Sequence, residues 1–122
     1  MLKVFGSKTM KTVNKPWGKE EHIENNEEYC GKLLYIDKGS KLSWQFHILK
    51  KETIYVQSGQ VLLKYSGGNS IKTSEEIVLN PKDSFTIPRG MRHQMIGLEE
   101  SVLIEFSTAH YDSDTNKLSE EH

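Results

Sequence analysis

The sequence predicts an all-β protein of one domain, folded as a small barrel or sandwich of short strands. β-Branched and aromatic residues come in short clusters between Leu33 and Phe106. Gly, Pro, Asn, Asp and Ser separate these clusters, as is typical of turns between strands. No apolar pattern of helical period persists long enough to indicate a substantial helix. Close spacing of the clusters favours a closed or two-sheet β architecture.

Eight clusters are the expected strands, and each is bounded by turn residues. They cover residues 33–36, 41–47, 53–57, 61–65, 76–79, 84–87, 93–96 and 102–107. Ser-Gly-Gln at 58–60 predicts a hairpin, and Ser-Gly-Gly-Asn at 66–69 predicts a looser turn. Asn-Pro-Lys-Asp at 80–83 and Pro-Arg-Gly at 88–90 enclose a strand of only a few residues.

The 122 residues suit a single domain with its own core. Residues 1–28 are charged and weakly patterned, so we expect an N-terminal arm with edge strands around Pro16, Trp17 and Gly18. We expect the barrel itself over residues 29–111. The polar segment 112–122 is expected to be a partly disordered tail.

Charge and cysteine content limit the partners and the compartment. With 16 basic and 17 acidic residues, the chain has no long-range field to attract nucleic acid or an anionic membrane, and we expect neither partner. No apolar run has the length of a signal peptide or a membrane span. Cys30 is the only cysteine, which excludes an intrachain disulfide and suits a reducing compartment. We therefore expect a cytoplasmic protein.

Four residues have the chemistry and spacing of a metal site. Gln45 and His47 are two apart, so on a strand their side chains point to the same face. Glu52 follows a short segment that could bend back toward that face, and His93 follows the rigid turn at 88–92. Two imidazoles, a carboxylate and an amide carbonyl suit zinc, manganese, iron, cobalt or nickel. One or two coordination positions would stay open for water or substrate.

Spacing alone leaves a purely structural interpretation open. Strict alternation in a half-buried strand would bury Leu42, Trp44 and Phe46 and place Gln45 and His47 in solvent. A carboxylate after two lysines and a histidine near a turn are also common on surfaces. The residues by themselves do not decide between these interpretations.

The stretch from Gly39 to Gly59 resembles the first motif of the cupin superfamily. That motif has Gly, five residues, His, any residue, His, three or four residues, Glu, six residues and Gly. Gly39, His47, Glu52 and Gly59 take these positions, with Gln45 in place of the first His. The resemblance implies a double-stranded β-helix, or jelly-roll barrel, around one metal ion.

The stretch 82–97 resembles the second cupin motif through Pro88, Gly90 and His93. It departs from that motif at its two ends, where Lys82 replaces the usual Gly and Gly97 the usual Asn. Neither end position is a metal ligand in the superfamily, so the resemblance still implies His93 as the fourth ligand.

A narrower resemblance is to the type II mannose-6-phosphate isomerase domain, often the C-terminal part of bifunctional enzymes with mannose-1-phosphate guanylyltransferase. The segments that carry it lie at residues 15–18, 41–47, 87–88, 93, 105–107 and 111. This resemblance implies zinc on Gln45, His47, Glu52 and His93 and a sugar phosphate as substrate. Two departures lie near the site: Gln94 replaces a common Arg, and residues 48–51 lack the family's histidines and Arg.

An isomerase of this kind needs a base, a group that stabilises the enediolate, and a phosphate site. A divalent metal would stabilise the enediolate oxygens as a Lewis acid. Glu105 and Lys41 are the candidate catalytic bases. Arg89 and Arg92 flank the turn before His93 and are the candidates for binding the substrate phosphate.

Two other functions remain open. The departures near the site favour a non-catalytic cupin that binds a sugar or a sugar nucleotide. Another metal-dependent cupin enzyme, such as a dioxygenase, is the third possibility.

The inward orientation of Gln45 and His47 would turn Leu42, Trp44 and Phe46 outward. An exposed row with two aromatic side chains needs a cover. We therefore expect a homodimer, or a cover supplied by residues 1–28.

Overall fold

The computed structural model describes residues 6, 7 and 9–121, and it is built almost entirely of strands. They are β1 (Lys11–Lys15), β2 (Gly18–Asn25), β3 (Cys30–Ile36), β4 (Gln45–Phe46), β5 (Glu52–Ser58), β6 (Val61–Ser66), β7 (Glu75–Leu79), β8 (Ser84–Ile87), β9 (Arg92–Gly97), β10 (Ser101–Ser107) and β11 (Asn116–Lys117). Two single-turn 3₁₀ helices, η1 (Ile71–Thr73) and η2 (Asp112–Asp114), complete the described elements.

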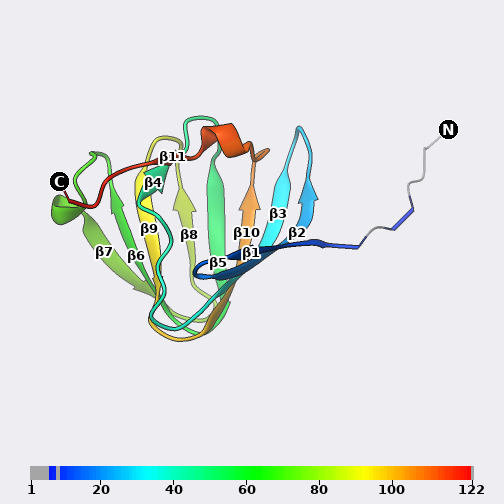
Figure 1. The fold of residues 1–122 in the computed structure, drawn as a ribbon, viewed down its shortest axis with the longest axis horizontal. Helices are drawn as coiled ribbons and strands as arrows, with labels where there is room; N and C mark the ends of the chain where they lie inside the picture. Colours follow the sequence, from blue (N-terminus) through cyan, green and yellow to red (C-terminus); the bar gives the residue numbers. More distant parts are fainter. Residues whose placement is uncertain (1–5, 8, 122) are drawn as a thin grey trace.

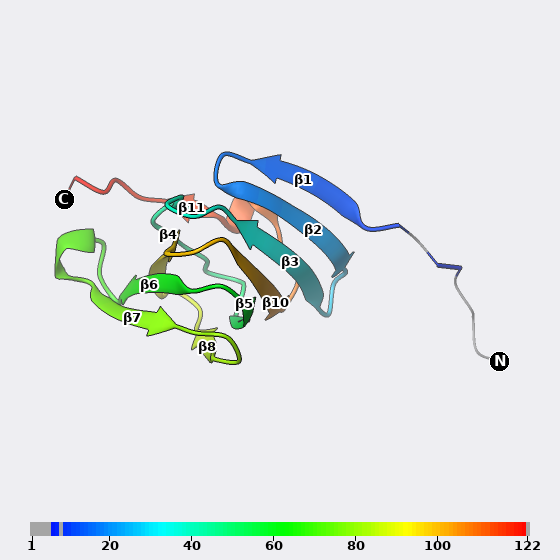
Figure 2. The same ribbon diagram turned by 90° about the horizontal axis from the view of Figure 1, so that it is seen from below.

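The strands form two antiparallel sheets that face each other (Figures 1 and 2). One has the order β1-β2-β3-β10-β5-β8 and the other β11-β4-β9-β6-β7. From β3 to β6 and again from β7 to β10, successive strands alternate between the sheets, which is the winding of a jelly roll. The predicted all-β, single-domain jelly-roll fold is confirmed.

The apolar core fills only one end of the space between the sheets. Along β3, buried and half-buried positions alternate, and the inward row is Cys30, Lys32, Leu34 and Ile36. Leu34 and Ile36 join the main apolar cluster, whereas Lys32 lies nearer the other end. Burial of each such aliphatic side chain stabilises the fold by about 1.5–3 kcal/mol. The rest of the interior is therefore free to carry polar groups.

The expected strand over 41–47 is mostly irregular. Only Gln45–Phe46 forms β4, and Lys41 makes an isolated bridge to Ile96. Because strict alternation is lost, Leu42 packs against the core rather than pointing outward. The predicted outward row of Leu42, Trp44 and Phe46 is therefore wrong at Leu42.

Trp44 is fully buried within one chain. Its indole Nε1 donates a hydrogen bond to the carbonyl of Asn69 at 2.8 Å, and its own carbonyl accepts from the Leu118 N–H at 2.8 Å. The loop between β6 and η1 and the segment after β11 supply these contacts. Trp44 is thus buried without a second copy of the chain.

Both ends of the chain add to the barrel. β1 and β2 extend the six-stranded sheet beyond β3, and Trp17 between them is buried. The C-terminal segment passes over one end of the barrel through η2, at the top of Figure 1, and β11 then pairs with β4. None of the described residues belongs to a helix with the length and hydrophobicity that a membrane span requires.

Candidate metal centre

The four residues expected to bind metal come together at the polar end of the barrel. Gln45 in β4 is the cross-strand partner of His93 in β9, His47 follows β4, and Glu52 begins β5. His47, Glu52 and His93 are each at most 4% exposed. One potential ligand atom from each of these three lies within 4.8 Å of the other two.

Both imidazoles are oriented by backbone carbonyls. Nδ1 of His47 lies 3.1 Å from the Asp114 carbonyl, and Nδ1 of His93 lies 2.9 Å from the Met91 carbonyl. A carbonyl only accepts, so each Nδ1 carries the proton and each Nε2 is directed to the interior. Nε2 of His93 lies 3.3 Å from Oε1 of Glu52. Outer hydrogen bonds of this kind are the usual support of metal-binding histidines.

Gln45 needs one local change to act as a ligand. Its Oε1 accepts a hydrogen bond from Oγ of Ser43 at 2.6 Å, and its Nε2 lies 3.5 Å from Nε2 of His47. A half-turn of the amide would exchange the two atoms and direct the carbonyl oxygen toward His47. The amide thus lies in the right place, with its nitrogen side facing the other donors.

The donor set fits a divalent cation. Oε2 of Glu52 is buried and has no hydrogen-bond partner among the described residues, although Nζ of Lys50 lies 3.0 Å away. The ammonium of Lys50 compensates the charge of this oxygen, and the cluster still offers one carboxylate oxygen and two imidazole nitrogens within 4.8 Å of one another. Two imidazoles, a carboxylate and an amide oxygen suit the first-row metals and zinc alike. The cluster can therefore hold a metal ion without fixing which one.

The protonation states favour metal binding. Burial, followed by the charge of Lys50, lowers the pKa of His47 to about 4. Burial opposes ionisation of Glu52, but the hydrogen bond with His93 and the charge of Lys50 hold its pKa below the usual value. Neutral imidazole and ionised carboxylate are the states that ligate metals.

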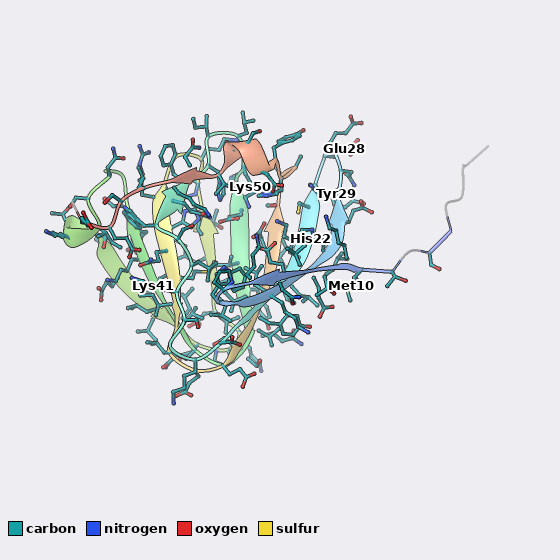
Figure 3. All side chains as sticks on the ribbon, viewed as in Figure 1. Met10, His22, Glu28, Tyr29, Lys41 and Lys50 are labelled. Carbon is teal, nitrogen blue, oxygen red and sulfur yellow. The ribbon has the colours of Figure 1, made fainter. Side chains whose placement is uncertain are left out.

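Lys50 is a buried cation that the sequence did not mark as part of the site. Its Nζ lies 3.0 Å from Oε2 of Glu52, 3.1 Å from Oε2 of Glu105 and 3.3 Å from Nδ1 of His110. Burial opposes the charged form, but the carboxylates of Glu105 and Glu52 more than offset it and raise the pKa of Lys50. Figure 3 labels Lys50, in the loop just before β5. The one available sign was its spacing of two from Glu52.

Asp114 is the second functional residue that sequence reasoning missed. Its carboxylate accepts hydrogen bonds of 2.9–3.2 Å from the backbone N–H groups of Ile48, Leu49 and Lys50, and its carbonyl orients His47. Burial opposes its ionisation, but the backbone N–H donors lower its pKa. The sequence assigned Asp114 to a polar tail, and no local pattern indicated this role.

The two candidate bases occupy different environments. Glu105 points inward from β10, and its Oε2 accepts hydrogen bonds from Lys50 and from Oγ of Ser107, at 3.1 and 3.3 Å. Burial raises the pKa of Glu105. Lys41 is more than half exposed and forms a 3.0 Å ion pair with Glu120.

The two candidate phosphate-binding arginines contact neighbouring loops. Nε of Arg89 donates to the carbonyl of Leu49 at 2.9 Å. The guanidinium of Arg92 stacks 3.9 Å above the centre of the Phe46 ring and donates to the carbonyl of Gly90. Neither arginine lines the cavity beside the metal centre.

That cavity has a volume of about 560 Å³ and runs from Gln45 and His47 toward β1 and β2. This volume is within the range of small-molecule sites. Glu105 and Lys41, the two candidate bases, both line it. The lysines on its wall are Lys11, Lys15, Lys32, Lys41, Lys50 and Lys117.

Comparison with known proteins agrees with this geometry. The family model described as mannose-6-phosphate isomerase C-terminal matches residues 6–117. No curated protein shows a significant match to the chain.

Solved structures share the fold at low sequence identity. KdgF from Halomonas sp. is 19% identical with a TM-score of 0.72, over 84% of this chain and 91% of that one. An RmlC-like cupin from Shewanella frigidimarina is 20% identical with a TM-score of 0.70, over 90% and 92%. The capsular polysaccharide assembling protein CapF from Staphylococcus aureus is 18% identical with a TM-score of 0.78, over 93% of this chain. The match spans only 35% of the CapF chain.

Proposed function

We propose that this chain, which belongs to the mannose-6-phosphate isomerase C-terminal family, is a metal-dependent aldose–ketose isomerase acting on a sugar phosphate. The observation that carries the proposal is the convergence of His47, Glu52 and His93, with both Nδ1 atoms fixed by carbonyls, beside a cavity of about 560 Å³. The cupin fold supports it as a scaffold for such a site.

In this proposal Gln45, His47, Glu52 and His93 hold one divalent metal, with zinc as the first choice. When bound, the ion would supply Lewis-acid stabilisation of the oxygens that become negative during isomerisation. Manganese, iron, cobalt and nickel are the alternatives that the same ligands accept. The protein's own part is to keep the imidazole of His47 neutral and to orient both imidazoles through their Nδ1 atoms.

Glu105 is the proposed base that moves the proton between adjacent carbons. Its carboxylate faces the cavity from the inner surface of β10, next to the charge of Lys50. A positioned carboxylate within a water-poor cavity can take a proton from one carbon and return it to the next. Lys41, on the same cavity wall, is the second candidate for this role.

The substrate, the assembly and the location are proposed with the activity. Arg89 and Arg92 stay candidates for the phosphate at the cavity mouth, but each would have to leave its present loop contact to reach inside. A homodimer, a cytoplasmic location and the division into arm 1–28, barrel 29–111 and tail 112–122 also remain proposals.

Isomerase activity is tested by removing the metal, reloading zinc, manganese or iron, and following mannose 6-phosphate and fructose 6-phosphate by NMR. We expect interconversion with at least one metal, loss of turnover in Glu105→Gln with metal content unchanged, and full activity in Lys38→Met. Lys38 is an exposed lysine whose ion-pair partner among the described residues is Glu99. No interconversion with any metal would reject the proposal.

A non-catalytic sugar or sugar-nucleotide binding protein is the second candidate, and one observation favours it. Oε2 of Glu105, the proposed base, is already held by Lys50 and Ser107. If that contact persists with ligand bound, the carboxylate cannot take up a proton through this oxygen. Binding of mannose 6-phosphate without turnover in the same experiment would favour this candidate.

A further inference from the structure

Lys32 is a buried cation with one ion pair, to Glu20, although the carboxylates of Glu105 and Asp112 also interact with its charge. It lies on the inner face of β3, is 3% exposed, and lines the cavity that begins at Gln45 and His47. Its nearest acidic partner is Oε1 of Glu20, 3.6 Å from Nζ. Nζ makes no hydrogen bond to any of the residues that the structure describes.

This arrangement is unfavourable unless another group reaches Nζ. Removing an ammonium group from water costs several kcal/mol, and paired, hydrogen-bonded charges are needed to offset that cost. Glu20 cannot supply all of this, because the same Oε1 is 2.8 Å from Nε2 of His22. On the side that faces the cavity, Nζ of Lys32 can therefore be stabilised by an oxygen atom that accepts a hydrogen bond.

The sheet register places Lys32 at a useful distance from the metal centre. Cross-strand pairing aligns Lys11, His22, Lys32 and Glu105 in one row across β1, β2, β3 and β10. Glu52 lies on β5, two strands from β3. With neighbouring strands about 4.8 Å apart, the two strands are separated by roughly 10 Å. A small ligand can contact the metal ligands at one end and Lys32 at the other.

The cavity wall carries more positive than negative side chains, as an anion-binding site requires. Six lysines line it against three carboxylates, those of Glu20, Glu105 and Asp112. A concave surface with such an excess raises the local concentration of anions. His22, which Figure 3 labels, contributes an imidazole next to Lys32 from β2.

We propose that Lys32 and His22 form an anion subsite that binds the phosphate or carboxylate of a small ligand whose other end lies at the metal centre. The choice of a phosphate rests on the proposed isomerase function, whereas the anion subsite does not depend on it. The subsite replaces Arg89 and Arg92 as the main source of anion recognition. Its position inside the cavity would select ligands of fixed length.

Binding is measured by calorimetry with mannose, mannose 6-phosphate and mannuronate, on the metal-free and the zinc-loaded full chain. We expect at least one of the two anions to bind about 10- to 100-fold more tightly than mannose, as for a charge-assisted hydrogen bond. Lys32→Met should abolish this preference and Lys32→Arg should keep most of it. Lys38→Met is the matched control and should bind as the parent does.

Glu20→Gln separates ligand recognition from a purely structural role. It removes the internal partner of Lys32 and should tighten anion binding. If Lys32 served only as a structural partner of Glu20, the variant would lose that ion pair without any gain in anion binding. Circular dichroism of each variant verifies folding. An unchanged anion preference in folded Lys32→Met, or its loss in Arg92→Gln instead, would overturn the subsite. Lys32-dependent binding of mannuronate with none of mannose 6-phosphate would support the subsite and reject the isomerase.

Discussion

At the scale of single residues, Asp114 performs two tasks with two different groups. Its carboxylate closes the turn 48–50 by accepting three backbone N–H groups, and its carbonyl fixes the proton of His47 on Nδ1. A buried carboxylate with this many donors is a strong local restraint. The turn that carries Lys50 and the orientation of the candidate ligand His47 therefore both depend on Asp114.

We predict that Asp114→Asn lowers zinc affinity by about 10- to 100-fold, as is typical for loss of an outer partner of a metal ligand. The amide has only one acceptor oxygen, and its NH₂ would face backbone donors. Competition with a fluorescent zinc chelator measures the affinity. Ser113→Ala, in the same turn but exposed, is the control. Equal zinc affinity of Asp114→Asn and the parent would show that the turn holds without the carboxylate.

The sequence predicted the candidate ligands better than their surroundings. Gln45, His47, Glu52 and His93 were found because motif spacing survives even where β4 is short. Lys50 was missed because its role depends on contact with Glu105, 55 residues away, which no local pattern indicates.

At the scale of elements, the turn that carries the chain from β5 in one sheet to β6 in the other depends on Gly59. Its φ is +86°, and a Cβ at this position would clash with the Glu100 carbonyl and with Oγ and Cα of Ser101. A turn at Ser-Gly-Gln was expected from the sequence, but the predicted hairpin is wrong, because β5 and β6 lie in different sheets and do not pair. The close approach of the loop before β10 was not predicted either. The turn therefore also determines how closely the first residues of β10 approach the end of β5.

We predict that Gly59→Ala destabilises the protein by roughly 2–4 kcal/mol, the sum of a strained left-handed conformation and a steric clash. Urea unfolding followed by tryptophan fluorescence measures the change. Gly67→Ala is the matched control, because a Cβ there would meet open space. A change below about 0.5 kcal/mol at Gly59 would show that the loop before β10 yields easily.

Element boundaries were predictable where side chains alternate regularly, and failed where they do not. Expected strands at 33–36, 61–65 and 102–107 lie within β3, β6 and β10. The segment 41–47 failed because packing of Leu42 and Trp44 on different sides outweighs the local preference for alternation. Pairing of β3 with β10 could not be read from local pattern, since the two strands are about seventy residues apart.

At the scale of the whole molecule, buried ionisable groups connect the stability of the fold to pH. The pKa of His47 is about 4 in the folded protein, against an ordinary value near 6.5. The unfolded chain therefore takes up a proton at a higher pH than the folded one. Stability contributed by neutral His47 is complete above about pH 6.5 and is lost as the pH falls toward 4.

We predict that the free energy of unfolding of the metal-free parent falls between pH 6.5 and pH 4. This fall should be about 3 kcal/mol larger than the fall measured for metal-free His47→Asn over the same range. Urea titrations of both proteins at several pH values measure this difference. Parallel pH profiles of the parent and His47→Asn would show that water or a rearranged side chain solvates the charged imidazole.

The bond between His47 and the carbonyl of Asp114 also has a consequence for biosynthesis. The two residues are 67 positions apart, so on the ribosome the first imidazole is made long before the group that orients it. His93 and β10 also come late in translation. A nascent chain that has passed Glu52 thus carries three of the four candidate ligands, and the candidate site is complete only after His93 and the segment around Asp114 have been synthesised and have packed on the barrel.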